Sequence, residues 1–200
     1  MDLGCISDVP YDSKYVDDSP YVCKSRKDNY ADRNAVVIAA KSQPLIELRL
    51  YMRATTDVID RAQLVVVRTK PDDPMNPKYC GVANNFRCKN EKAVLVPVPM
   101  ATRLGLYAFL TRFQFFWKTD ADRGFVQVIQ AASAVHQTGL ELFNELYVSE
   151  YMLFGQINGP SFFELNFNVM ACDLKFNQKV VKNIFDDILS GSNSWDNLLA

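Results

Sequence analysis

The sequence is poor in the residues from which catalytic and metal sites are usually built. It has a single histidine, His136, and five cysteines. Nucleophilic catalysis needs a serine, cysteine or threonine beside a base, and His136 stands in an alanine-rich run that offers it no partner. Cys80 and Cys88 are separated by seven residues, a spacing that fits no common zinc motif. The sequence therefore predicts no catalytic residue, no metal site and no cofactor.

Glycine is also scarce. The 8 glycines form neither of the phosphate-binding motifs GxxxxGKS/T and GxGxxG, so no motif indicates nucleotide binding. Adjacent acids occur at 17–18, 72–73 and 186–187, and such pairs are typical of solvated loops and helix faces. The odd number of cysteines, in a chain without an export signal, argues against a disulfide framework.

Uninterrupted apolar runs of membrane-spanning length are absent. The longest apolar stretch, 93–117, contains Pro97, Pro99, Arg103 and Arg112. Each central arginine would cost about 2.5 to 3.5 kcal/mol in a bilayer. The first residues carry acids where a secretory signal would need basic residues followed by an apolar run. We therefore expect no transmembrane segment and an intracellular protein, cytoplasmic or nuclear.

The apolar content is high enough for one folded domain. The 200 residues are 48% apolar, within the range of a domain with its own core. Residues 1–34 follow no structural period and offer too little apolar surface to offset the entropy of ordering them. They are expected to form a flexible, acidic, tyrosine-bearing arm. A single domain is expected over 35–190, followed by a short tail over 191–200.

Several stretches have the residue patterns of strands. Apolar residues at 46, 48, 50 and 52 alternate with polar ones, which predicts a half-buried strand. A β-branched run at 63–68 predicts a second strand, and alternation over 163–171 predicts another. The stretch 104–118 fits either a strand or a buried helix, and its aromatic run favours a strand. Three prolines between 71 and 91 indicate a long loop.

Two stretches have helical periodicity. Apolar residues between 125 and 146 recur at helical spacing, which predicts a long helix. Paired apolar residues between 180 and 189 predict a C-terminal helix that ends before Gly191. The elements do not alternate as βαβ units would, so we expect an α+β fold. Its largely antiparallel sheet would be packed by one long and one C-terminal helix.

Charge is distributed unevenly along the chain. Residues 41–123 contain fourteen basic and eight acidic residues, a net charge of +6. On the expected strand 46–52, Arg49, Tyr51 and Arg53 would share one exposed face. Guanidinium groups beside an aromatic ring suit contacts with phosphates and bases, as in proteins that bind single-stranded RNA. The alternative is a solvated outer face of an antiparallel sheet. The other members of this basic group are Arg61, Arg68 and Lys70.

The two ends of the chain have features of protein-binding motifs. Tyr11 and Tyr21 each follow a proline in the expected arm, where docking or modification could reach them. Trp195, Leu198 and Leu199 follow a Gly-Ser break in an acidic setting, where an exposed aromatic could anchor a partner. The alternative for Trp195 is that it folds back onto the core.

These patterns favour a non-enzymatic structural or interaction protein that self-associates or docks into a larger assembly. Small virion matrix or accessory proteins of RNA viruses resemble this layout of an arm ahead of an α+β domain, by analogy alone. A binder of single-stranded RNA or nucleoprotein, using the basic strand face, is the first alternative. A cysteine-dependent enzyme using Cys80 or Cys88 is the second. The expected partners are a protein or a second copy of the chain, with nucleic acid or an acidic membrane surface as further classes.

Overall fold

The computed structural model describes residues 5–17, 19, 32–54, 60–68, 78, 80–99, 101–121, 124–173, 181–184 and 187–195. In chain order the elements are β1 (Ile6–Tyr11), α1 (Asp32–Glu47), β2 (Met52–Arg53), β3 (Ala62–Arg68), β4 (Cys80–Asn84), α2 (Arg87–Asn90), α3 (Arg103–Leu110), β5 (Phe115–Asp120), the 3-10 helix η3 (Gly124–Gln127), β6 (Val128–Gln130), α4 (Ala132–Val135), β7 (Leu140–Leu142), β8 (Glu145–Val148), α5 (Gly159–Asp173), β9 (Val181–Ile184) and β10 (Asp187–Ser192). Within these ranges, no helix is both long enough and apolar enough to cross a membrane.

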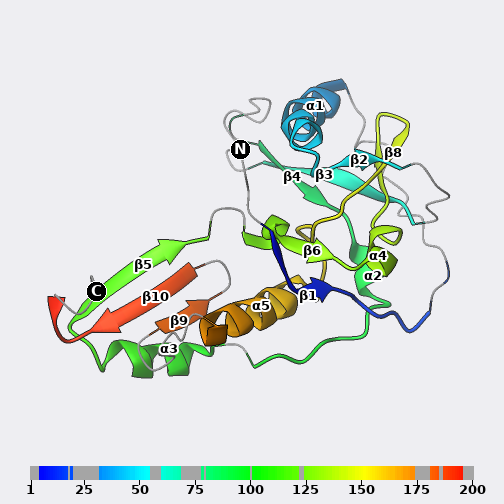
Figure 1. Ribbon diagram of the computed structural model, residues 1–200. Helices are drawn as coiled ribbons and strands as arrows, with labels where there is room; N and C mark the ends of the chain where they lie inside the picture. The colour runs from blue at the N-terminus through cyan, green and yellow to red at the C-terminus, as the bar shows by residue number, and fades with distance from the viewer. Residues whose placement is uncertain are drawn as a thin grey trace.

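Among the described residues, the strands form three sheets (Figure 1). A five-stranded sheet has the order β2-β8-β7-β3-β4, and α1 contacts β3 and β4. A three-stranded antiparallel sheet has the order β5-β10-β9, and β1 pairs with β6 in parallel. Figure 1 shows the three-stranded sheet with α3 on one side of the molecule and the five-stranded sheet with α1 on the other. The α+β class with largely antiparallel sheets is confirmed.

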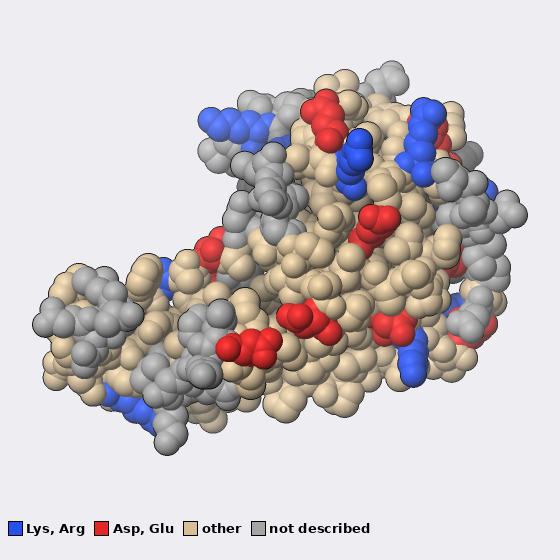
Figure 2. Space-filling view, in the orientation of Figure 1, with Lys and Arg blue, Asp and Glu red and all other residues tan. Residues whose placement is uncertain are grey.

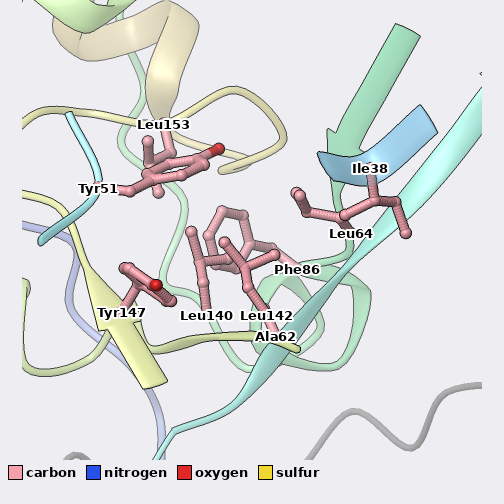
Figure 3. Packing of buried hydrophobic residues seen from close by; sticks show 9 residues of the cluster. All are labelled: Ile38, Tyr51, Ala62, Leu64, Phe86, Leu140, Leu142, Tyr147 and Leu153. Atoms are coloured by element: carbon pink, nitrogen blue, oxygen red, sulfur yellow. The ribbon is translucent and has the colours of Figure 1, made fainter. Parts of the chain in front are cut away.

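The main hydrophobic core is built on the five-stranded sheet. Leu64 of β3, Leu140 and Leu142 of β7, and Phe86 just before α2 are each at most 3% exposed. Figure 3 shows these side chains in one cluster. Both outer residues of the short strand β7 are buried, which fixes its register because a one-residue slip would turn them out of the core.

A second core joins β1, β6 and α5. Tyr11 of β1 is 1% exposed, and its ring lies 4.9 Å from that of Phe162 on α5, centroid to centroid. Val128 of β6 and Met152 complete the cluster with no measurable exposure, at 0%. The N-terminal strand is therefore part of the folded body.

The long helix predicted over 125–146 is wrong. The stretch folds as η3, β6, α4, β7 and β8. Its buried residues come in alternating pairs, Val128 with Gln130 in β6 and Leu140 with Leu142 in β7. Gln130 is buried because its side-chain amide donates hydrogen bonds to backbone carbonyls, including that of Ser149 at 2.9 Å. An analysis of apolar residues counts Gln130 as a surface residue, so it misses the alternation of buried and half-buried residues along β6.

The strand predicted over 163–171 is also wrong, because these residues lie within α5. The buried side chains of α5 recur at helical spacing and are Phe162, Phe163, Asn166, Phe167 and Ala171. Asn166 is polar and 1% exposed. When it is counted as a surface residue, the remaining apolar residues alternate and imitate a strand.

The C-terminal helix predicted over 180–189 is replaced by the strands β9 and β10, which pair in antiparallel fashion. A buried polar residue again obscured the alternation of buried residues that is typical of a strand. Asn183 of β9 is 5% exposed, and its Nδ2 donates to Glu164 Oε2 on α5 at 2.8 Å. Alternation of Val181 and Asn183 toward α5 is the true period of this stretch.

The strand predicted over 46–52 is largely helix and turn. α1 continues through Pro44 to Glu47, and the backbone N–H of Leu48 donates to the Pro44 carbonyl at 3.0 Å. Arg49 then turns the chain with a φ of 58°. Leu50 is buried at the end of this turn, with 2% exposure. The apolar residues at 46 and 50 therefore reach the core from a helix end and a turn.

Three further predictions are resolved by the structure. The strand at 63–68 is confirmed as β3. The stretch 104–118 is a helix and then a strand, since α3 begins after Thr102, whose Oγ1 accepts from the Gly105 N–H at 3.1 Å. The expected loop 71–91 contains β4 and α2, and most of its remaining residues lie outside the described part.

The expected flexible arm contains an ordered strand. Asn166 of α5 binds both backbone groups of Val9, accepting from its N–H at 3.0 Å and donating to its carbonyl at 2.8 Å. These two hydrogen bonds help to hold β1 in place. The low apolar content of residues 1–34 gave no sign of them, because they are polar contacts with a distant helix. Residues 20–31 of the expected arm lie outside the described part, and the boundary at 34 stays a prediction.

Replacing Asn166 with alanine is expected to lower the free energy of unfolding by about 2 to 3 kcal/mol. The reason is that the partly buried N–H and C=O groups of Val9 would both lose their hydrogen-bond partner. Denaturant unfolding measures the change, and Asn168→Ala, a change on the same helix, is the matched control. A loss in Asn166→Ala no larger than in the control would contradict this account of how β1 is held.

A buried lysine joins four segments of the body. Lys89 of α2 is 3% exposed, and its ammonium lies 3.5 Å from Asp60 Oδ2 and 4.6 Å from the centroid of the Tyr15 ring. The ammonium also donates to the carbonyl of Gln137. Burial lowers the pKa of Lys89 to about 8, against the opposing attraction of Asp60.

Thermal stability is therefore expected to increase between about pH 8 and pH 10. In that range the unfolded chain holds the Lys89 proton while the folded chain releases it, so folding is favoured as the pH rises. Above about pH 10 the trend reverses, because burial raises the pKa of Tyr11 to about 12 and the unfolded chain loses its tyrosine protons first. Calorimetry should give a midpoint about 4 °C higher near pH 9.5 than near pH 7.5. The rise should be absent in Lys89→Met, and an equal rise in that variant would contradict the assignment.

Candidate functional site

Two aspartates face each other at one end of the three-stranded sheet. Asp120 is the last residue of β5 and Asp187 the first of β10, and the antiparallel register pairs them directly. Directly opposed residues place their Cβ atoms roughly 4.5 to 5.5 Å apart on the same face of a sheet. Strand pairing therefore brings together two carboxylates that are 67 positions apart in the sequence.

The carboxylates lie on the face of the sheet that points away from α5. Asn183 of β9 bonds to Glu164 of α5, and Ile188 of β10 lines a small hollow with Phe163 of the same helix. Since side chains alternate along a strand, Asp187 projects to the side opposite Ile188, and Asp120 projects with Asp187. This face is accessible, because Asp120 is exposed.

A lysine shares this face. Lys118 lies two residues before Asp120 on β5, and its Nζ is 2.8 Å from Asp187 Oδ1. The two side chains of this pair are 62% and 36% exposed, so the ion pair is open to solvent and contributes little to stability. Its effect is on charge, because one ammonium offsets part of the negative charge of the two carboxylates.

The sequence adds a third carboxylate beside the pair. Asp186 directly precedes Asp187 in the sequence and lies outside the described residues. Within the described part, no group of three His, Cys, Asp or Glu side chains is arranged to hold a metal. The donor set of Asp120 and Asp187 fits a hard divalent cation such as Mg²⁺, which prefers one or two carboxylates together with water and phosphate oxygens.

The structure separates the residues expected to form a basic strand face. Arg49 is exposed in the turn after α1, while Tyr51 is 4% exposed and donates through its hydroxyl to Asn84 Oδ1 at 3.2 Å. Burial raises the pKa of Tyr51 to about 12. Arg53 pairs with Glu145 of β8. The three side chains therefore do not share one exposed strand face.

The remaining members of the basic group give no continuous surface. Arg61 is exposed just before β3, Arg68 ends β3, and Lys70 lies outside the described residues. On the face drawn in Figure 2, lysine and arginine side chains are scattered and interleaved with acidic ones.

The residues expected to bind a protein partner differ in their exposure to solvent. Tyr11 is buried in the second core and so is not accessible for docking or modification. Trp195 is 56% exposed, with its ring edge-on to Phe115 at 5.9 Å between centroids. Tyr21, Leu198 and Leu199 lie outside the described residues. Of this set, Trp195 keeps the exposed position that a partner contact requires.

The residues considered for cysteine chemistry come from three different elements. Cys80 is buried in β4, Cys88 is half-buried in α2, and His136 is exposed at the end of α4. Cys5 and Cys172 are exposed free thiols.

Comparison with known proteins identifies a structural relative. No protein-family profile and no curated protein matches the sequence. The fold matches the solved protease-reverse transcriptase of prototype foamy virus, a CSH mutant, with a TM-score of 0.72 and 16% identity. The match covers 94% of this chain and 24% of the viral one, so this chain spans about a quarter of that protein's length. At this identity the likeness shows a shared fold.

This match contradicts the expectation of a non-enzymatic structural or interaction protein. The shared fold occurs in the chain of a protease-reverse transcriptase, which is an enzyme. The sequence analysis failed here because it treated Asp186 and Asp187 as an ordinary solvated pair and gave Asp120 no functional role. The available signal was their setting, since Asp120 lies three residues after an aromatic run that ends at Trp117, and the pair Asp186-Asp187 directly follows Ile184-Phe185.

Proposed function

We propose that this chain is part of a template-directed nucleic-acid polymerase of the reverse-transcriptase type, in which Asp120 and Asp187 bind divalent cations. The observation that carries the proposal is the register that sets these two carboxylates directly opposite each other at the end of β5 and the start of β10. The similarity in fold to a protease-reverse transcriptase supports the choice of reaction. The sequence neighbour Asp186 is the third carboxylate of the proposed site.

The position of the pair suits a large polymeric substrate. The carboxylates lie on the face of the sheet that α5 leaves open. In Figure 1 the end of the sheet that carries them, where β5 ends and β10 begins, is the end nearest the rest of the molecule. Figure 2 shows a concave outline between the two sides of the molecule in the same region. A nucleic acid seated there would reach the carboxylates from the open face.

The chemistry of phosphoryl transfer explains the need for these residues. Bound divalent cations neutralise the charge that develops on the transferring phosphoryl group and orient the attacking and leaving oxygens. The chain's contribution is to hold carboxylate oxygens at fixed positions, and anchoring on two paired strands gives Asp120 and Asp187 that rigidity. Lys118, bound to Asp187 at 2.8 Å, reduces the repulsion between the carboxylates.

A proteolytic role for the same pair is disfavoured by its surroundings. Aspartic proteases use two carboxylates that share one proton, an arrangement that needs close like charges in a protected site. Here Asp120 is exposed and Asp187 has a lysine ammonium 2.8 Å away, so the pair is neither enclosed nor without a basic neighbour. Ionised carboxylates are the form that binds Mg²⁺.

The direct test is binding of Mn²⁺, a paramagnetic substitute for Mg²⁺, to the full chain. Nuclear magnetic resonance should show selective broadening of the backbone signals of residues 118–120 and 187–189 at low Mn²⁺ concentration, with reversal by excess Mg²⁺. Magnesium-dependent extension of a DNA primer on an RNA template should accompany it. Broadening confined to other acidic residues would overturn the proposal.

A further inference from the structure

A second hollow lies on the opposite side of the three-stranded sheet from the two aspartates. It has a volume of about 370 Å³, opens to solvent, and is bordered by β9, α5 and the segment before α3. That volume falls within the range of small-molecule sites. Four of the side chains around it are apolar: Pro99, Ala101, Phe167 and Val181. The proposed polymerase chemistry makes no use of this hollow.

Two polar side chains in the hollow, Asn183 and Glu164, have oxygen atoms that can accept further hydrogen bonds. Asn183 is 5% exposed, and its Nδ2 donates to Glu164 Oε2 at 2.8 Å, which fixes the orientation of the amide. Asn183 Oδ1 is buried and has no hydrogen-bond partner among the residues that the structure describes. Buried polar atoms without a partner are rare in native proteins, and each calls for an explanation such as a ligand or an ordered water.

The hollow offers acceptors and negative charge. A carboxylate has about four acceptor positions, and Asn183 uses one of those on Glu164. Lys182 also borders the hollow, but it alternates with Asn183 along β9, so its Cβ projects toward the other face of the sheet. A ligand head group would therefore meet a carboxylate and an amide oxygen, both of which require a donor.

We propose that this hollow binds a small organic cation with a flat, donor-rich head, such as an amidine or a guanidine, attached to an apolar body. The head would donate to Glu164 and to Asn183 Oδ1, which satisfies the buried oxygen. The apolar body would lie against Phe167, Val181 and Pro99. Charge-assisted hydrogen bonds from a planar cation to a carboxylate are among the strong ones in proteins, so the head group sets the specificity.

The test is a titration of the full, ¹⁵N-labelled chain with benzamidine and with benzamide, its neutral analogue of the same shape. Benzamidine should shift the backbone signals of residues 181–183 and 164 and the side-chain amide signals of Asn183, with a dissociation constant on the order of 1 mM. Benzamide should bind at least about tenfold more weakly, because it lacks the charge. Equal binding of the two compounds, or benzamidine shifts that map elsewhere, would overturn the proposal.

Two substitutions make the test specific. Glu164→Gln keeps an acceptor for Asn183 and removes the charge, so it should weaken benzamidine binding by about tenfold and leave benzamide unchanged. Asp173→Asn removes an exposed carboxylate at the end of the same helix, outside the lining of the hollow, and should leave both affinities unchanged. An unaltered benzamidine affinity in Glu164→Gln would reject the site. The two aspartates take no part in this readout, so its result is independent of the polymerase proposal.

Discussion

An Asp187→Asn variant is expected to extend a primer about 100- to 1,000-fold more slowly than the unchanged chain, and Asp120→Asn is expected to do the same. Asparagine keeps the size of aspartate and removes its charge, so a divalent cation loses a ligand at the site. Metal ions stabilise a phosphoryl-transfer transition state by several kcal/mol, and each 1.4 kcal/mol corresponds to a factor of about ten in rate. Single-turnover extension of a DNA primer on an RNA template measures the rate.

The matched control is Asp173→Asn, an exposed aspartate at the end of α5. It should extend the primer at the normal rate. All three variants should unfold at the same denaturant concentration as the unchanged chain, because Asp120 and the ion pair of Asp187 are solvent-accessible. Normal extension by either site variant would remove the carboxylate pair from the reaction and with it the proposed function.

The largest effect on stability is expected from Lys89→Ala, which should lower the free energy of unfolding by about 3 to 5 kcal/mol. Removing one member of a buried ion pair leaves the other charge in a poorly solvated place. Here the Asp60 carboxylate would lose an ammonium 3.5 Å away, and the Gln137 carbonyl would lose its donor. Denaturant unfolding at pH 7 measures the change.

The control lies on the same helix. Arg87 forms an exposed pair with Glu91 at 3.3 Å, with side-chain exposures of 85% and 66%. Arg87→Ala should therefore cost less than about 1 kcal/mol. Similar losses in the two variants would show that α2 contributes through helix formation and not through the buried ammonium.

The fold class could be predicted from the sequence, but most element positions could not. β3 was found because Val65, Val66 and Val67 are β-branched and nothing polar interrupts them. β6, α5 and β9 were missed for one shared reason, which is that each buries an amide side chain: Gln130, Asn166 and Asn183. A buried amide is stabilised by hydrogen bonds to distant segments, and patterns of apolar residues carry no information on such partners.

The candidate site could not be predicted from the sequence, for a different reason. Asp120 and Asp187 become neighbours through the pairing of β5 with β10, a contact between segments 67 positions apart. Pairing of that kind depends on register, and register cannot be read from one strand alone. The third carboxylate, Asp186, was visible as one of several acidic pairs, with nothing local to distinguish it.

The way β1 is held also constrains the order of events during synthesis. Val9 is bound by Asn166, 157 positions later in the chain. A ribosome adding about 5 to 20 residues per second needs roughly 8 to 30 s to cover that distance. For that interval the segment from Ile6 to Tyr11 lacks its partner on α5, whereas β6, its neighbour in the sheet, is synthesised earlier. During this interval, a chaperone that recognises short apolar segments would be able to bind the segment Ile6–Tyr11.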